Sequence, residues 1–288
     1  MDRSVDTSES TRPSPSAARW VENRPSRGLR WPDLRELWHY RELAGFFALR
    51  DLKVRYKQAV LGIGWALLQP VAGVVVFSLV FRKLVNVPSE GVPYPVFSLA
   101  GLALWSYASS GVTRATQSLV TNSTLVTKVY FPRLLAPVAA VIPGLLDLLI
   151  ALVLLAVLLP VSGVVPGIAA LTVPVWILAA VVAVLGIGVL LGTLNVTYRD
   201  VSQAIALLVQ LWLFVTPVAY PSRLVGFPWR PLYFANPMAG VIEGFRWAVL
   251  GTPWPGSVVW ISIASAMGIL ACAVALFEAS ERRFADVI

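Results

Sequence analysis

The sequence is poor in charge and has almost none of the residues that build metal and redox sites. Only 13% of its 288 residues are charged, about half the share of a typical soluble domain. It has one histidine, His39, and one cysteine, Cys272. A single cysteine excludes an internal disulfide, and without a Cys/His cluster the sequence predicts no metal site. Cys272 lies in an apolar stretch, and we expect it to act as a small packing residue there.

Nucleotide-binding and catalytic motifs are also missing. The chain has four lysines, and none follows a glycine. It therefore lacks the G-x-x-x-x-G-K-[ST] loop that cradles ATP phosphates. The apolar region holds few carboxylates, mainly Asp147 and Glu243, and no converging set of acid, base and metal ligands. These absences predict a chain that holds no cofactor and is not an enzyme by itself.

Long apolar runs dominate what is present. Hydrophobic residues make up 57% of the chain, and the mean hydropathy is +0.74. A helix of roughly 20 apolar residues crosses the roughly 30 Å hydrocarbon core of a bilayer. The sequence predicts an all-α membrane protein with six transmembrane helices, at about residues 62–85, 95–119, 134–159, 168–195, 202–220 and 258–277.

Basic residues predict the orientation. Twelve of the 23 lysines and arginines precede Gly62, and positive charge favours the cytoplasmic side of a membrane. We expect a multi-pass protein of the plasma (inner) membrane with both termini in the cytoplasm. The net charge of +8 is then mainly a topology signal, and no nucleic-acid partner is expected.

The flanks of the apolar region divide into segments. Residues 1–31, rich in Ser, Pro and Arg, predict a disordered cytoplasmic tail. Residues 32–61 predict an amphipathic interface helix against membrane lipids, started by a capping box of Asp33 and Glu36. The transmembrane domain is expected at 62–277, and a cytoplasmic C-terminal tail at 278–288.

The stretch 221–256 is too rich in proline to span a membrane and too apolar for an ordinary loop. It predicts a re-entrant hairpin with Asn236 at the buried tip, where Asn236 caps a helix that starts at Pro237. Glu243 and Arg246 are one turn apart on that helix and are expected to pair. The alternative is an amphipathic helix on the outer surface.

Other residues in the spans allow two interpretations. Gln203 and Gln210 share one helix face, and either line a wet path or bond between helices. Asp147 is costly at mid-membrane, and we expect it to serve packing or dimer register. The G-x-x-x-G pairs at 188–192 and 240–244 predict close helix packing.

Several motifs occur in an order that resembles the permeases of ABC-2-type polysaccharide exporters, which export O-antigen, teichoic acid or capsule. They are RDLKVRYKQAVLGIGWALLQP at 50–70, LVTKVYFPR at 125–133, LNVTYRD at 194–200, NPMAGVIEGFRW at 236–247 and FADVI at 284–288. The resemblance covers about residue 49 to the end. It is specific for the family and does not identify the glycan.

The resemblance implies a homodimer that works with two copies of a separate ABC ATPase, which binds the ATP and Mg. It implies export of a lipid-linked polysaccharide. The ATPase-coupling candidates are Lys128, Tyr130, Arg133, Arg50 and Lys53, although a basic loop held by lipid phosphates is an alternative. A permease for a drug or lipid, a membrane enzyme of lipid or glycan synthesis, and a non-transporting scaffold are the competing functions.

Aromatic residues are candidates for the translocation path, because sugars stack on aromatic faces. The candidates are Trp65, Phe77, Trp105 and Tyr107, together with the amides of Gln203 and Gln210. The alternative for the aromatics is an interfacial belt. The predicted gate is formed by Asn236, Glu243 and Arg246.

Overall fold

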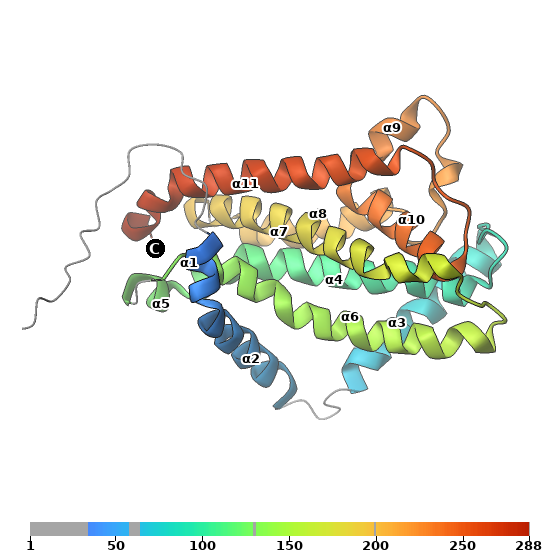
Figure 1. The fold of residues 1–288 in the computed structure, drawn as a ribbon, viewed down its shortest axis with the longest axis horizontal. Coiled ribbons are helices and arrows are strands. Elements are labelled where there is room, and N and C mark those ends of the chain that lie inside the picture. The colour runs from blue at the N-terminus through green and yellow to red at the C-terminus, as the bar shows by residue number, and fades with distance from the viewer. Residues whose placement is uncertain (1–33, 58–63, 129–130, 199, 288) are drawn as a thin grey trace, which may run out of the picture. The chain divides into compact units, whose positions relative to one another are not determined.

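The computed structural model describes residues 34–57, 64–128, 131–198 and 200–287, all within the unit formed by residues 31–288. The predicted tail 1–31 and the predicted cap Asp33 lie outside the described residues. The described residues form helices and no strands (Figure 1).

The elements follow one another along the chain. They are α1 (Leu34–His39), α2 (Arg41–Lys57), α3 (Gly64–Phe77), the π-helix η1 (Ser78–Leu84), α4 (Tyr94–Thr121), α5 (Ser123–Lys128), α6 (Leu135–Val161), the 3-10 helix η2 (Ile168–Thr172), α7 (Val173–Thr197), α8 (Val201–Val215), the 3-10 helix η3 (Ser222–Leu224), α9 (Trp229–Tyr233), α10 (Pro237–Leu250) and α11 (Val259–Val287).

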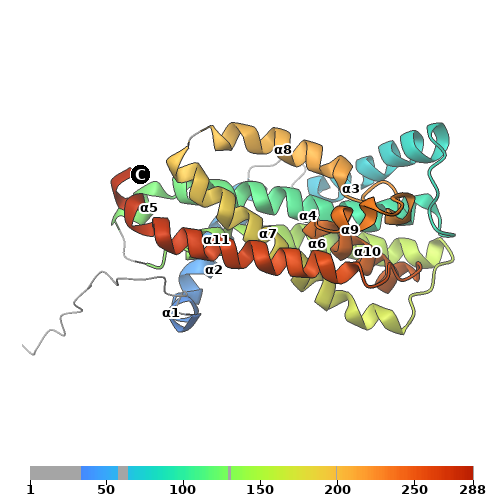
Figure 2. The ribbon, with the colours of Figure 1, turned by 90° about the horizontal axis from the view of Figure 1, so that it is seen from above.

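The long helices pack as a bundle around α4. Helix α4 lies between α6 and α7, and α11 packs on the other side of α7 (Figures 1 and 2). Small residues allow these approaches, because a Cβ added at Gly188 would lie 2.4 Å from the Cβ of Ala115 on α4. Likewise, a Cβ at Gly186 would lie 2.9 Å from the backbone nitrogen of Leu270 on α11. The predicted packing role of the 188–192 glycines is confirmed.

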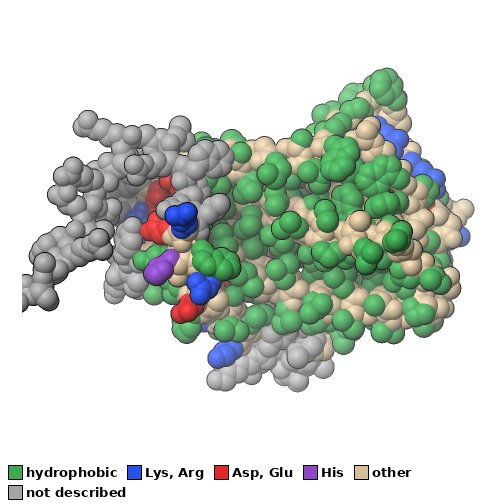
Figure 3. Space-filling view, viewed as in Figure 1, with side chains coloured by type: hydrophobic (Ala, Val, Ile, Leu, Met, Phe, Trp, Pro, Cys, Tyr) green, Lys and Arg blue, Asp and Glu red, His purple; other side chains and the backbone are tan. Residues whose placement is uncertain are grey.

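Within the described residues, four segments are long and apolar enough to cross a bilayer, which indicates a multi-pass membrane protein. They are Leu67–Leu84, Leu135–Val161, Ile168–Thr197 and Val259–Glu281. Figure 3 shows a broad apolar surface, with charged side chains near the two ends of the described bundle. Helix α4 has 28 residues but carries many hydroxyl side chains, which lower its hydropathy below that of these four.

The predicted fifth span, 202–220, ends too late. Helix α8 has 15 residues and ends at Val215, so it is about 22 Å long. Thr216 precedes Pro217 and is extended, with φ −108° and ψ 141°. A proline disfavours helical conformation in the residue before it, which explains the early end.

The segment predicted as one interface helix breaks at Tyr40 into α1 and α2. Ala44 and Phe47 on α2 are buried against Phe131 and the start of α6, whereas Trp38 on α1 is 70% exposed. The apolar residues of this segment therefore divide between the protein and the exposed surface.

At the other end of the chain, α11 continues past the predicted end at Phe277 to Val287. The prediction that Cys272 packs internally is wrong, because its side chain is exposed in the described chain. The face of α11 that turns inward carries Ala266, Ala273 and Phe277, and Cys272 lies outside that face.

Candidate functional site

A stripe of polar side chains runs along α4. Ser106, Ser109, Ser110, Thr113 and Gln117 follow the three- and four-residue spacing of one helix face and are all partly exposed. The opposite face of the same helix is buried in the core. Hydroxyl groups of the stripe donate to backbone carbonyls of their own helix. Ser110 Oγ donates to the Tyr107 carbonyl at 3.3 Å, and Thr113 Oγ1 donates to the Ser109 carbonyl at 2.8 Å. Their oxygens retain acceptor capacity toward the space in front of the stripe.

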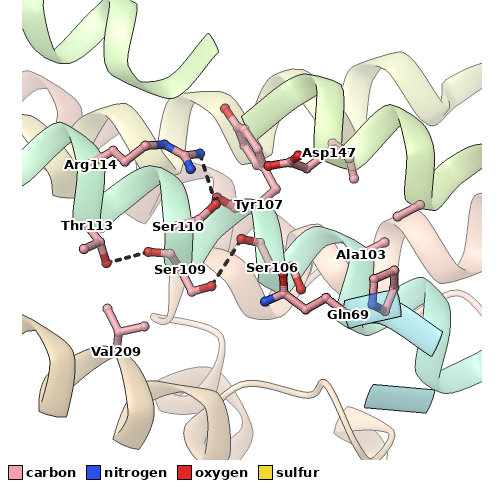
Figure 4. Close-up of a pocket in the computed structure, with 13 residues that line it drawn as sticks. Gln69, Ala103, Ser106, Tyr107, Ser109, Ser110, Thr113, Arg114, Asp147 and Val209 are labelled. Carbon is pink, nitrogen blue, oxygen red and sulfur yellow. Dashed lines mark hydrogen bonds between the residues drawn. The ribbon is translucent and has the colours of Figure 1, made fainter. Parts of the chain in front are cut away.

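The stripe faces a cavity of about 450 Å³. Helices α3, α4, α6 and α8 all contribute to its wall (Figure 4). The lining consists of Gln69, Pro70, Ala103, Ser106, Tyr107, Ser109, Ser110, Thr113, Arg114, Asp147, Leu148, Ala151 and Val209. A space with this many hydroxyl, amide and charged groups among apolar helices is suited to a polar ligand.

Arg114 and Asp147 bring opposite charges to this cavity. Arg114 Nε donates to the Ala140 carbonyl at 3.2 Å, and its Nη2 donates to Ser110 Oγ at 3.1 Å. The guanidinium fits only because α6 has a glycine there, since a Cβ at Gly144 would lie 2.5 Å from Arg114 Nη2. Charged groups inside a membrane face protein or water, and here they face a shared polar space.

A second cavity of about 490 Å³ adjoins the first at Arg114, which lines both. It lies between α2, α4 and α6 and is lined by Arg50, Gln117 and Asn122 among others. Arg50 Nη2 donates to Asn122 Oδ1 at 2.9 Å and pairs with Asp51 at 2.9 Å. From Ser106 to Asn122 the chain rises about 24 Å. We call the two cavities together the α4 groove.

The path candidates divide between the groove and other places. Tyr107 lines the first cavity, whereas Trp105 is buried with its ring 5.1 Å from that of Trp212. Phe77 stacks at 5.2 Å on Phe81. The side chain of Trp65 lies outside the described residues.

Gln203 and Gln210 are exposed on α8 and line neither cavity. Sequence reasoning overlooked the hydroxyl stripe of α4. Its signal was the spacing of Ser and Thr between 106 and 113, which an average over an apolar window conceals.

Asn236 holds the start of α10 against the end of α8. It caps α10 as predicted, with Oδ1 accepting from the Met238 backbone nitrogen at 3.1 Å. The same oxygen accepts from Trp212 Nε1 at 3.0 Å, and Nδ2 donates to Thr216 Oγ1 at 2.8 Å. Nearby, Tyr233 Oη donates to Tyr220 Oη at 3.2 Å.

Glu243 and Arg246 pair at 3.3 Å, as predicted. Arg246 is fully buried and also donates to the carbonyl oxygens of Pro217 at 2.6 Å and Val218 at 2.5 Å. Glu243 Oε1 accepts from the Ser222 backbone nitrogen at 3.2 Å. The pair thus fixes the turn after α8 from within the protein, and it does not face either cavity of the groove.

The glycines of α10 sit at close contacts. A Cβ at Gly240 would lie 2.7 Å from the Ser262 side chain, and a Cβ at Gly244 would lie 2.3 Å from the Trp176 ring. The predicted packing role of this second G-x-x-x-G pair is confirmed.

Helices α1 and α5 and the end of α11 lie at one end of the described bundle (Figure 1), and the coupling candidates come from α2 and from the chain around α5. Arg133 donates to the Glu281 carbonyl of α11, and Lys53 is exposed. The Lys128 side chain and all of Tyr130 lie outside the described residues. Elsewhere too, the described part of the chain has no group of three or more His, Cys, Asp or Glu suited to a metal ion.

Comparison with known proteins gives consistent matches over most of the chain. A family model described as ABC-2 type transporter matches residues 45–250. A protein named O-antigen export system permease protein RfbA, from Myxococcus xanthus, is 30% identical over 260 residues, which cover 88% of this chain and 98% of that protein. A protein of the same name from Klebsiella pneumoniae is 29% identical over 244 residues, which cover 83% of this chain and 92% of that protein.

Proposed function

Since the chain belongs to the ABC-2 type transporter family, we propose that it is the permease subunit of an ATP-driven exporter of a lipid-linked polysaccharide, O-antigen or a related cell-surface glycan. The names of the relatives from Myxococcus xanthus and Klebsiella pneumoniae support this substrate class. The ATP and Mg are bound by a separate ATPase subunit, and this chain holds no cofactor.

The α4 groove is the single observation that carries the proposal. Its lining offers hydroxyls at Ser106, Ser109, Ser110 and Thr113, and amides at Gln69 and Gln117. A sugar chain presents hydroxyls that both donate and accept, and each lining group can exchange hydrogen bonds with them. An apolar drug or lipid tail gains nothing from these groups and would leave them without water, which is costly.

Two copies of the chain form the path. Helix α8 buries a single residue, Ile205, of its 15, and the window Leu67–Leu84 has no buried residue. Both helices border the first cavity through Val209 and Gln69. A second copy packed on this side would close the groove, and a twofold pair is the commonest arrangement of soluble homo-oligomers.

The proposed topology has six spans, with α4 and α8 added to the four segments given above. The α9–α10 segment is re-entrant, with Asn236 at its tip against the early end of α8. At about 22 Å, α8 is shorter than the roughly 30 Å hydrocarbon core, and the α9–α10 segment occupies the remaining thickness. The end with α1 and α5 faces the cytoplasm across the inner membrane, and the N- and C-terminal segments are cytoplasmic.

We keep the domain boundaries expected from the sequence. They are a tail at 1–31, an interface segment at 32–61, the transmembrane domain at 62–277 and a C-terminal segment at 278–288. The interface segment and the loop at 122–133 contact the ATPase. Arg50 and Arg133 support this role, because each ties a separate element to that end of the bundle.

Alanine at Lys128, Tyr130 and Arg133 together should uncouple the complex. We expect normal membrane insertion, because the three residues lie between the long apolar helices, and a loss of both permease-stimulated ATP hydrolysis and export. ATPase rates of the co-purified complex and membrane abundance by immunoblot check this. Wild-type stimulation in the triple variant would show that the loop only marks topology.

Deletion and complementation test the function as a whole. A strain without this chain should lose surface glycan and accumulate the lipid-linked polymer inside the cell, and the wild-type chain with its ATPase should restore display. Purified alone, the chain should not hydrolyse ATP. Unchanged surface glycan in the deletion strain would contradict the proposed substrate.

A further inference from the structure

One buried hydroxyl in the α4 groove has no protein partner. Tyr107 is 1% exposed, and within the described residues nothing hydrogen-bonds its Oη atom. Its side chain lines the first cavity between α4 and α6 (Figure 4). Buried polar atoms without partners are rare in proteins and call for an explanation. A ligand in this cavity that accepts or donates at Oη supplies one.

Two opposite charges stand beside this hydroxyl. Arg114 comes from α4 and Asp147 from α6, and both line the same cavity (Figure 4). The space for Arg114 is provided by Gly144, whose added Cβ would also lie 3.1 Å from the Tyr107 ring. Three functional groups therefore converge where α6 lacks a side chain: a cationic donor, an anionic acceptor and a phenol.

The charge balance selects the ligand. A phosphate or carboxylate would be attracted by Arg114 and repelled by Asp147, and an ammonium ion would meet the reverse. A neutral ligand dense in hydroxyls meets no repulsion, because a carboxylate accepts from two hydroxyls and a guanidinium donates to ring and hydroxyl oxygens. The hydroxyls of Ser106 and Ser110 extend this surface on the same helix.

We propose that this part of the α4 groove is a saccharide station, in which Asp147 accepts hydrogen bonds from sugar hydroxyls while Arg114 and Tyr107 bind sugar oxygens. The proposal rests on the proposed export function and deepens it by naming neutral sugar units as the ligand that pauses at this depth. The phosphate of the lipid carrier is not the group bound here.

Removal of the Tyr107 hydroxyl is the first test. Tyr107→Phe deletes only an atom without a protein partner, so thermal stability should stay the same or rise. The rate of surface glycan appearance in complemented cells should fall about 2- to 10-fold, the effect of one lost hydrogen bond. Tyr94→Phe is the matched control on the same helix, because Tyr94 Oη donates to the Ala219 carbonyl at 2.7 Å; it should lower stability. Wild-type export by Tyr107→Phe would overturn the station.

A photo-cross-linking amino acid gives the second test, in cells that make the native glycan and carry the full complex. Placed at Ser106 in the first cavity and at Gln117 in the second, it should capture glycan at both positions. Asp147→Asn should reduce the adduct at 106 more than that at 117. An adduct at 117 without one at 106, an adduct at 106 that lacks sugar, or a stronger 106 adduct in Asp147→Asn would each overturn the station. No adduct at either position, with no export, would instead contradict the proposed function.

Discussion

Arg246 is the residue whose replacement should damage the fold most. It is fully buried, and its guanidinium donates to the carbonyl oxygens of Phe97 at 3.3 Å, Pro217 at 2.6 Å and Val218 at 2.5 Å. It also pairs with Glu243 at 3.3 Å and lies 3.6 Å from the centre of the Phe97 ring. Arg246→Met keeps much of the volume and removes every one of these interactions.

The expected loss follows from what remains behind. Glu243 becomes a buried carboxylate without its cation, which costs about 3–5 kcal/mol when one partner of a buried pair is removed. Two carbonyls of the turn after α8 lose their donor in the same step. Glu243→Gln is milder, at about 1–2 kcal/mol, because the amide oxygen still accepts from the Ser222 nitrogen and the carbonyls still surround the cation.

Thermal inactivation of the purified protein in detergent measures this order. The wild type should keep its monodisperse gel-filtration peak to the highest temperature, followed by Glu243→Gln, then Arg246→Lys, which keeps the charge without the planar fork, and last Arg246→Met. If Arg246→Met is as stable as Glu243→Gln, the guanidinium does not hold the turn through its carbonyl partners.

Two further outcomes are expected. Gly244→Ala should destabilise the protein by about 1–3 kcal/mol, because its Cβ would overlap an indole ring at 2.3 Å in a packed site, whereas Gly268→Ala, with open space around it in α11, should be neutral or stabilising in the same melting assay. In a Cys272→Ala background, Phe227→Cys, at a site 89% exposed, should react with a membrane-impermeant thiol reagent added outside, and Asn236→Cys should be protected; equal labelling would refute the re-entrant hairpin.

Local patterns predicted much of the fold and part of the site. The apolar runs predicted where the long helices lie, because a helix forms its backbone hydrogen bonds within its own segment. The Asn236 cap and the Glu243–Arg246 pair were also predictable, since both join positions within one turn of the same helix. The structure confirms both.

The features that the sequence did not predict depend on partners far away in the chain, or are hidden when hydropathy is averaged over a window. The role of Arg246 is set by carbonyls 28 to 149 residues away, which no local pattern encodes. The groove was missed because the Ser and Thr residues of α4 alternate with strongly apolar neighbours, and a window average merges the two faces. The end of α8 was predictable from Pro217, but the apolar residues beyond it concealed the break.

The hydroxyl stripe of α4 also has a consequence for how the protein is made. A helix leaves the translocon for lipid more readily the more hydrophobic it is, and an arginine within the helix lowers that tendency. Helix α4 carries Arg114 and falls outside the four segments most able to partition alone. We therefore expect α4 to stay beside the translocon until α6 and α7, with which it packs, have been synthesised. The same hydroxyls that line the α4 groove thus lower the tendency of α4 to enter lipid alone, and we expect truncation before α6 to leave α4 exposed to membrane quality control.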